Sequence, residues 1–191
     1  MTVQEYNERK AQSYKLLLWF AMISMVMMFA GLTSAYVVST SRKDWLKEFD
    51  MPIAFVWSTV LIIISSITIH LALSFIKKND QTKTGLLLWI TLLLGIGFVF
   101  TQFLGFGQII ENGYFFTGSE SNVTTSFLYI IVILHMVHLF GGLIALLFVI
   151  YNHYKQKYNS TQTLGIELAA MFWHFLDFLW ILLFLFFYFY E

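Results

Sequence analysis

The chain has 191 residues, of which 59% are hydrophobic and 19% aromatic, while only 12% are charged and one is proline. This composition is far too apolar for an ordinary soluble domain and indicates an integral membrane protein. Eleven basic and 11 acidic residues balance to a net charge of zero, without the basic stripe of a nucleic-acid-binding protein. The absence of cysteine excludes disulfides, thiolate metal sites and a cysteine nucleophile.

Five apolar runs are each long enough to cross a membrane as a helix. They cover about residues 16–38, 52–76, 85–110, 126–151 and 165–190. Crossing ~30 Å of hydrocarbon takes about 20 helical residues, and helices satisfy their own backbone there. The first run lacks a convincing small-residue cleavage site, so we expect it to be retained. The sequence therefore predicts an all-α membrane protein, with a cytoplasmic tail at residues 1–14 and a single five-helix domain at 15–191.

The basic residues of the loops predict how this bundle is oriented. On the side of the N-terminus the sequence places eight: Arg9, Lys10, Lys15, Lys77, Lys78, Lys83, Lys155 and Lys157. On the opposite side it places three: Arg42, Lys43 and Lys47. Because basic loops tend to remain in the cytoplasm, the N-terminus is predicted to be cytoplasmic and the C-terminus to lie outside.

Ionisable residues within the last two runs are the candidate site. Glu167 and His174 are seven residues apart and share one helix face, and Asp177 follows on a neighbouring stripe. The run before carries His135 and His138. Such groups are costly in hydrocarbon, so they are expected to face protein. If each helix is centred on its apolar run, His138 and Asp177 lie near mid-membrane, which predicts a contact between them.

These residues allow three interpretations, of which we favour an interhelical hydrogen-bond or ion-pair network. A membrane metalloenzyme could use His135, His138, His174 and Glu167, because imidazole and carboxylate suit zinc or iron. The Glu-x-x-His motif of di-iron bundles is absent, however. A small ion or proton transporter could be organised on the same stripe, although broken helices or paired repeats, which are frequent in transporters, do not occur.

Small and aromatic residues predict how the helices pack. Gly31, Gly97, Gly105 and Gly141 each have another small residue one turn away, and such pairs let helix backbones approach closely. Another helix could also press close at Gly141 and Gly142. Trp173 and Trp180 lie beside the polar stripe and are expected to pack within the bundle or against a partner. His70, near the inner end of the second run, is expected to reach the membrane interface.

Residues 165–180 read GIELAAMFWHFLDFLW and closely resemble the last helix of subunit III of haem-copper terminal oxidases. In that helix Glu-Ala-Ala is followed by Trp-His-Phe-Val-Asp and Trp. Residues 134–142, LHMVHLFGG, resemble the family's His-Gly-x-His-Val-x-x-Gly helix, and Gln102 resembles a glutamine of the helix before it. Residues 23–36 resemble the first core helix. The resemblance covers about residues 16–190 in order, and five spans correspond to the short bacterial form.

Two positions depart from the family pattern. The family often has a glutamate where this chain has Met25, and another where it has Gly105. A proton-handling role resting on either acid is therefore not expected here. The resemblance implies that Glu167, His174 and Asp177 form a structural network or contact lipid, and we place His135 and His138 in the same expected group.

The resemblance also implies a function. Subunit III holds no haem or copper, packs against catalytic subunit I, binds phospholipid in a cleft, supports proton uptake and prolongs the life of the oxygen-reducing site. We accordingly expect a non-catalytic subunit, with no cofactor in this chain and with haem and copper in partner subunits. Subunits I and II, membrane lipids and other respiratory complexes are the expected partners, in the bacterial cytoplasmic (inner) membrane. Cytochrome c is the expected electron donor and quinol the alternative, because another subunit makes that choice.

Overall fold

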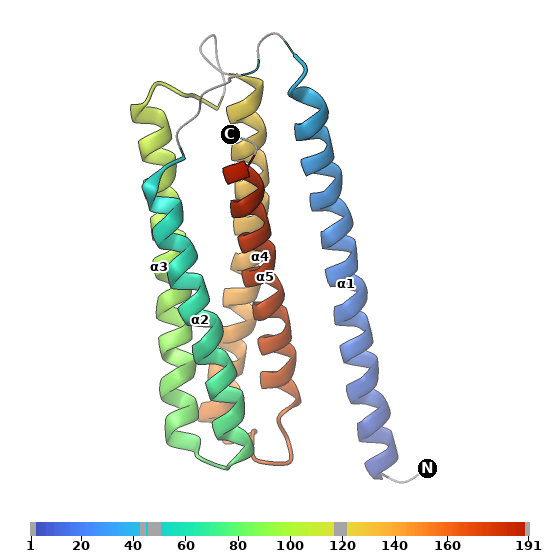
Figure 1. Cartoon of the computed structure of the whole chain (residues 1–191). Coiled ribbons are helices and arrows are strands. Elements are labelled where there is room, and N and C mark those ends of the chain that lie inside the picture. Colours follow the sequence, from blue (N-terminus) through green and yellow to red (C-terminus); the bar gives the residue numbers. More distant parts are fainter. Residues whose placement is uncertain (1–2, 43–44, 46–50, 117–121, 190–191) are drawn as a thin grey trace.

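The computed structural model describes residues 3–42, 45, 51–116 and 122–189. These residues contain five α-helices and no β-strand: α1 (Val3–Ser39), α2 (Ile53–Lys77), α3 (Gln81–Glu111), α4 (Val123–Tyr154) and α5 (Leu164–Phe189). All five helices are long and apolar enough to cross a membrane. The predicted all-α architecture with five spans is therefore confirmed (Figure 1).

The helix ends agree with the predicted spans except at the start of α1. This helix begins at Val3, well before the apolar run, because the polar residues that precede the run are mostly good helix formers such as Glu, Lys, Arg and Gln. The bounds of α2 to α5 lie within four residues of the predicted ones. Tyr190, the predicted end of the last span, and Lys43 and Lys47 of the orientation argument lie outside the described residues.

The turn between α2 and α3 explains why α3 starts four residues earlier than predicted. Asn79 adopts a left-handed φ of 60°, which asparagine tolerates better than most residues. Asp80 then caps α3, because its carboxylate accepts a hydrogen bond of 3.1 Å from the backbone N–H of Lys83. Its second oxygen lies 3.0 Å from the Lys83 ammonium. The Lys83 hydrogen bonds hold the pKa of Asp80 below its ordinary value of 3.8.

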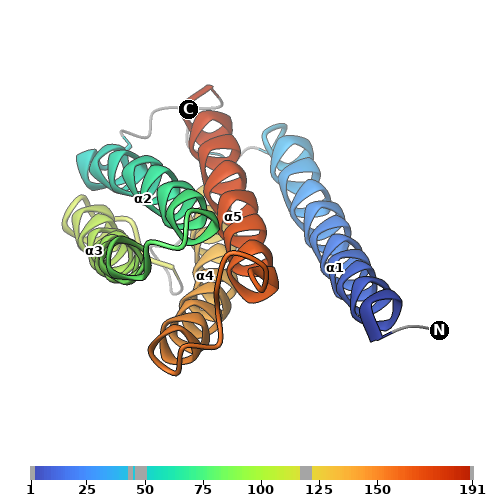
Figure 2. The same ribbon diagram turned by 90° about the horizontal axis from the view of Figure 1, so that it is seen from below.

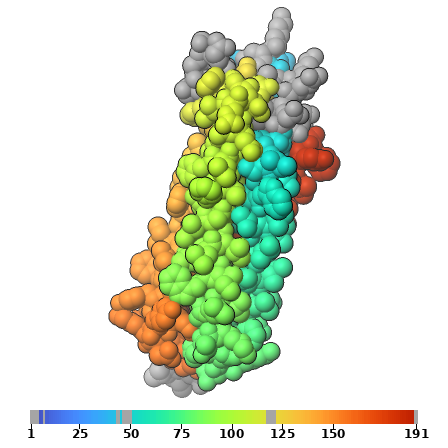
Figure 3. Space-filling model, turned by 90° about the vertical axis from the view of Figure 1, so that its left-hand side faces the viewer, coloured from blue at the N-terminus to red at the C-terminus, as the bar shows by residue number. Residues whose placement is uncertain are grey.

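Helices α2 to α5 form a compact bundle, and α1 packs at its edge with few buried side chains. Figures 1 and 2 show α5 between α2 and α1, with α4 behind and α1 at the edge of the bundle. Figure 3 shows the opposite flank, where α3 lies in front with α2 and α4 on either side. Among the α1 side chains that the structure describes, the buried ones are Met22, Phe29 and Tyr36, spaced seven residues apart. A seven-residue step keeps contacts on one narrow stripe, so α1 touches the bundle along a seam rather than a broad face.

Two large aromatic rings occupy the closest helix approaches. A Cβ atom on Gly95 of α3 would lie 2.7 Å from Cη2 of Trp173. A Cβ atom on Gly105 would collide with the ring of Phe55. Gly105 therefore does permit a close helix approach, as predicted.

The close approach predicted at Gly141 and Gly142 is confirmed at Gly142 alone, and Gly31 and Gly97 have no comparably close neighbour. Gly141 has no atom within 4 Å of an added Cβ, whereas on Gly142 such an atom would lie 2.9 Å from Cδ1 of Leu176. Trp173 and Trp180 are each 1% exposed, which confirms that they pack within the bundle.

Candidate functional site

The polar side chains of the candidate site lie mainly along the contact between α2 and α5, which run antiparallel. We call this row the α2–α5 seam, and it consists of Thr59, Ser65, Ser66, His70 and Lys77 from α2, with Glu167, Trp173, His174, Asp177 and Trp180 from α5. Seven residues span about two helical turns, so residues spaced by seven return to nearly the same face. Lys77 with His70, Glu167 with His174, and Trp173 with Trp180 all have this spacing.

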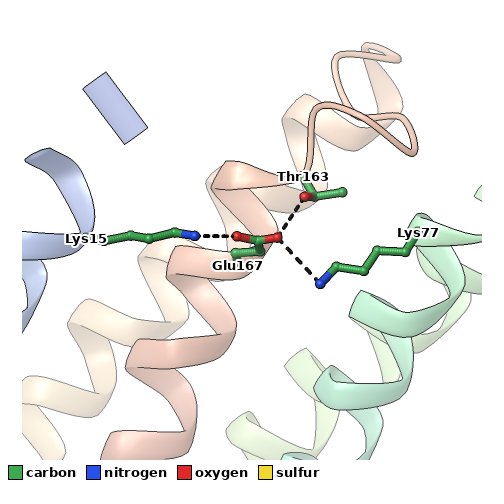
Figure 4. A network of polar contacts seen from close by, with 4 residues as sticks. All are labelled: Lys15, Lys77, Thr163 and Glu167. Atoms are coloured by element: carbon green, nitrogen blue, oxygen red, sulfur yellow. Dashed lines mark hydrogen bonds and ion pairs between the residues drawn. The ribbon is translucent and has the colours of Figure 1, made fainter. Parts of the chain in front are cut away.

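Glu167 is at one end of the seam and joins three helices (Figure 4). Its Oε2 atom lies 2.8 Å from the Lys15 ammonium of α1. Its Oε1 atom lies 3.6 Å from the Lys77 ammonium of α2 and accepts a hydrogen bond of 2.9 Å from the Thr163 hydroxyl. Glu167 is in the first turn of α5, where the helix dipole also favours a negative charge. The two lysine contacts of this carboxylate therefore hold α1 and α2 to α5.

His174 is about 10 Å deeper along α5, at a rise of ~1.5 Å per residue. Its Nδ1 atom is 2.6 Å from the Ser66 hydroxyl of α2. The ring of His70, which is exposed on α2, has its centroid 5.9 Å from that of His174. Sequence reasoning missed Ser66 and the link between the two histidines. The second apolar run does contain these polar residues, but their spacing alone does not show which helix they face.

The tryptophans of α5 complete the seam with hydrogen bonds to α2. The Trp173 indole N–H donates to the Ser65 hydroxyl at 2.9 Å, and the Trp180 indole N–H donates to the Thr59 hydroxyl at 3.0 Å. Buried indole N–H groups need such acceptors. These bonds fix α5 against α2 at two depths in the membrane.

Asp177 is 2% exposed, so its carboxyl group faces protein, as its cost in hydrocarbon requires. Ser66 is in polar interaction with it. Neither carboxyl oxygen, however, has a partner at hydrogen-bonding geometry within the part of the chain that the structure describes. Asp177 is thus a buried acid that the bundle leaves largely uncompensated.

The predicted contact between His138 and Asp177 is wrong. The Nδ1 atom of His138 lies 2.7 Å from the carbonyl oxygen of Leu134 on its own helix, and since a carbonyl only accepts, Nδ1 carries the proton. The His138 ring meets Phe29 of α1 at a centroid distance of 5.8 Å. His138 therefore faces α1 while Asp177 faces α2. Their similar depth in the membrane did not imply a shared interface.

His135 behaves as a core aromatic residue. It is fully buried, and its ring packs against Trp180, Phe98 and Phe29 at centroid distances of 5.3, 6.0 and 6.4 Å. Neither ring nitrogen has a hydrogen-bond partner among the described residues. His135 thus contacts the α2–α5 seam only through the ring of Trp180 and adds no hydrogen bond to it among the described residues.

The residues of the metalloenzyme interpretation are dispersed over three environments. Glu167 binds lysines, His174 binds Ser66, and the two histidines of α4 face aromatic rings. Among residues 3–42, 45, 51–116 and 122–189, no three His, Asp or Glu side chains are grouped so that they could hold a metal ion. The geometry of these side chains fits contacts that hold helices together rather than the ligands of a metal ion.

Gln102, the α3 glutamine of the resemblance, is fully buried and donates a hydrogen bond of 3.0 Å to the Ser58 hydroxyl of α2. It thereby joins α3 to α2 next to Thr59, a residue of the seam. Met25, at the position where the family often has a glutamate, is half-buried on α1.

A groove of about 500 Å³ lies where α1 diverges from α4 and α5. We call it the α1 groove. Its walls are mostly apolar and include Leu18, Ala145, Phe148, Leu168, Ala169 and Phe172, with Tyr14, Asn152 and Tyr158 as its polar members. Burial raises the pKa of the Tyr158 phenol above its ordinary value of 10.0, so this hydroxyl stays neutral and available for hydrogen bonding. An elongated apolar molecule with a polar end matches this lining.

Known proteins resemble the chain over nearly its whole length. The family model described as cytochrome c oxidase subunit III matches residues 5–191. Cytochrome c oxidase subunit 3 of Thermostichus vulcanus is 33% identical over 167 residues, covering 85% of this chain and 80% of the relative. Probable cytochrome c oxidase subunit 3 of Nocardia farcinica is 30% identical, with 95% and 89% covered. Cytochrome bo(3) ubiquinol oxidase subunit 3 of Pseudomonas putida is 30% identical, with 87% and 80% covered.

Proposed function

The chain belongs to the cytochrome c oxidase subunit III family, and from that premise we propose that it stabilises a haem-copper oxidase complex without carrying a redox centre itself. The observation that carries this proposal is the family match from residue 5 to residue 191, which includes all five helices. The catalysis would belong to the complex, which reduces oxygen to water and translocates protons. Within this chain these ionisable groups hold helices together, because Glu167 joins three helices and His174 joins two.

The proposed partners are subunit I by direct contact, then subunit II and other respiratory complexes. Haem and copper would reside in those partner subunits. Large apolar side chains are exposed along all five helices, and lipid or neighbouring subunits must cover them in a membrane. The broad exposed face of α3 in Figure 3 is one surface that such a partner or lipid would cover.

Phospholipid is the proposed ligand of this subunit, with the α1 groove as its binding site. The groove opens between membrane-crossing helices and combines apolar walls with a polar end at Tyr14, Asn152 and Tyr158. An acyl chain suits the walls, and a glycerol or headgroup oxygen can accept from the tyrosine hydroxyls. Native mass spectrometry of the purified complex, before and after replacing Ala169 with Phe, tests this assignment, because the larger side chain would fill the groove and displace lipid.

We also propose that this subunit supports proton uptake by the complex. This role would not depend on Gly105, because the Phe55 ring occupies the space that a side chain there would need. Met25 supplies no acid either. Of the described residues, Glu167 and Asp177 are the acids inside the bundle, and Asp177 is deeper and largely uncompensated. A loss of proton uptake rate in an Asp177→Asn complex, measured by stopped-flow pH indicator, would support this role.

We propose cytochrome c as the electron donor, since most of the relatives described above are named cytochrome c oxidase subunit 3. The ubiquinol oxidase relative from Pseudomonas putida keeps quinol as the alternative. Oxygen consumption by the purified complex with reduced cytochrome c, compared with a soluble quinol, separates the two.

A bacterial cytoplasmic membrane with the N-terminus inside is the proposed location. The start of α1 and the turn between α2 and α3 lie at the same end of the bundle (Figure 1). Lys15, Lys77 and Lys83 belong to that end, which supports its placement on the cytoplasmic side. Protease accessibility of a short tag fused to either terminus in sealed vesicles tests this orientation.

Deletion of the chain from the complex tests the proposed division of labour. The haem absorption spectra of the remaining complex should be unchanged, and its initial turnover should persist. Activity should then decline faster during turnover than in the intact complex. Loss of haem on deletion would contradict a non-catalytic role, and an unchanged decay of activity would contradict a stabilising one.

A further inference from the structure

The contact stripe of α1 ends in two different kinds of attachment. Lys15, Met22, Phe29 and Tyr36 follow one another at seven-residue steps. Tyr36 is 3% exposed and its ring is surrounded by those of Trp45, Phe186, Phe187 and Phe127, at centroid distances of 4.7 to 6.2 Å. One end of α1 is thus held by a dense aromatic cluster.

The other end of the stripe is held by the ion pair between Lys15 and Glu167, at 2.8 Å. The two side chains are 40% and 23% exposed. A partly exposed ion pair contributes little net free energy, because solvent screens it and ordering two long side chains costs entropy. This attachment is accordingly much easier to open than the aromatic cluster at Tyr36.

The ion pair also borders the α1 groove. Tyr14 and Leu18, which line the groove, flank Lys15 on α1, and Gly165 and Leu168 flank Glu167 on α5. Figures 1 and 2 show α1 at the edge of the bundle, where its buried side chains form a single narrow stripe that leads from the ion pair to Tyr36. Breaking the ion pair would therefore widen the groove at this end while Tyr36 keeps the opposite end of α1 in place.

We propose that the Lys15–Glu167 ion pair is a latch that closes the α1 groove, and that α1 pivots about the Tyr36 cluster to admit a phospholipid acyl chain from the bilayer. This inference rests on the proposed lipid binding and adds its regulation. Lys77 contacts the same carboxylate but belongs to α2, so it holds Glu167 in place without restraining α1. Lys77 therefore provides a matched control.

The test measures lipid exchange and the position of α1 in the whole oxidase complex. Complexes loaded with deuterated phosphatidylglycerol are transferred to nanodiscs of unlabelled lipid, and the loss of label is followed by native mass spectrometry. Lys15→Met should accelerate exchange by about threefold or more, whereas Lys77→Met and the charge-preserving Lys15→Arg should stay within about twofold of the wild type. Because the chain has no cysteine, spin labels at Leu17→Cys and Ile144→Cys report the α1–α4 distance, which should lengthen or broaden in Lys15→Met alone.

Equal exchange rates and equal spin-label distances in Lys15→Met and Lys77→Met would overturn the latch. If the wild-type complex retains no phospholipid, the proposal that the α1 groove binds phospholipid is wrong, and the latch proposal fails with it. Retained lipid with unchanged exchange in Lys15→Met would overturn the latch alone and leave lipid binding intact.

Discussion

His174 and Ser66 are 108 positions apart in the sequence, yet the histidine Nδ1 and the serine Oγ lie 2.6 Å apart across the contact between α5 and α2. Two helices intervene between them along the chain. Together with the Trp173–Ser65 and Trp180–Thr59 hydrogen bonds, this contact makes α2 the main polar partner of α5. The polar face of α5 thus contacts mainly α2.

Replacement of Ser66 by Ala should weaken the attachment of α5 to α2. His174 would lose its hydrogen-bond partner while remaining half-buried, and an unsatisfied buried polar group costs about 1–3 kcal/mol. We expect the free energy of unfolding in mild detergent to fall by about 1–2 kcal/mol. Ser13→Ala is the control, because the exposed Ser13 hydroxyl bonds to a carbonyl of its own helix, and its effect should stay within about 0.5 kcal/mol. Equal effects of the two changes would show that the 2.6 Å contact does not stabilise the bundle.

Replacement of Asp177 by Leu should not destabilise the chain. The carboxyl group is buried without a well-formed hydrogen bond among the described residues, and His138 does not depend on it. Removing an uncompensated buried polar group should raise the free energy of unfolding by about 1–3 kcal/mol. Thermal unfolding of the purified complex measures this, with Asp177→Asn as the variant of similar volume. A marked loss of stability in both variants would reveal a polar partner, such as an ordered water molecule.

Adjacent glycines on α4 should differ sharply in their tolerance of a methyl group. Gly142→Ala would place a Cβ atom 2.9 Å from Leu176 and 3.4 Å from Trp173, so the α4–α5 contact must spread. Such overpacking typically costs about 1–3 kcal/mol. Gly141→Ala meets no atom within 4 Å and should be neutral or slightly stabilising, because alanine favours helix more than glycine does. Similar melting temperatures for the two variants would contradict this packing of α4 on α5.

The start of α3 should become less stable in acid. The hydrogen bonds from Lys83 depress the pKa of Asp80 below 3.8 in the folded chain, so the stabilisation is present above that value and is lost as the pH falls through the lower, folded pKa. Hydrogen-exchange protection of the Lys83 amide, corrected for intrinsic rates, should therefore hold from neutral pH to about pH 4 and then fall. Asp80→Asn keeps a capping oxygen without the charge, so its protection should not change across this range. A fall of the same size in Asp80→Asn would assign the effect to another group.

The sequence by itself determined the number of helices, their limits to within a few residues for α2 to α5, and which face of α5 must avoid lipid. The length of each apolar run and the 3.6-residue period carry that information. Unpaired backbone groups and ionisable side chains cost free energy in hydrocarbon whichever helices are neighbours. The burial of Asp177, Trp173 and Trp180 follows from the same physics.

Only the tertiary structure decided which helix each polar face meets. Periodicity fixes the face of a helix but not its neighbour, and lipid tails are as apolar as leucine, so no hydrophobic force selects one pairing over another. The pairing of helices depends instead on how side chains fit, such as Trp173 against Gly95, and on hydrogen bonds between distant residues, such as His174 with Ser66. For that reason Asp177 faces α2 rather than His138, and Glu167 of α5 pairs with Lys15 of α1.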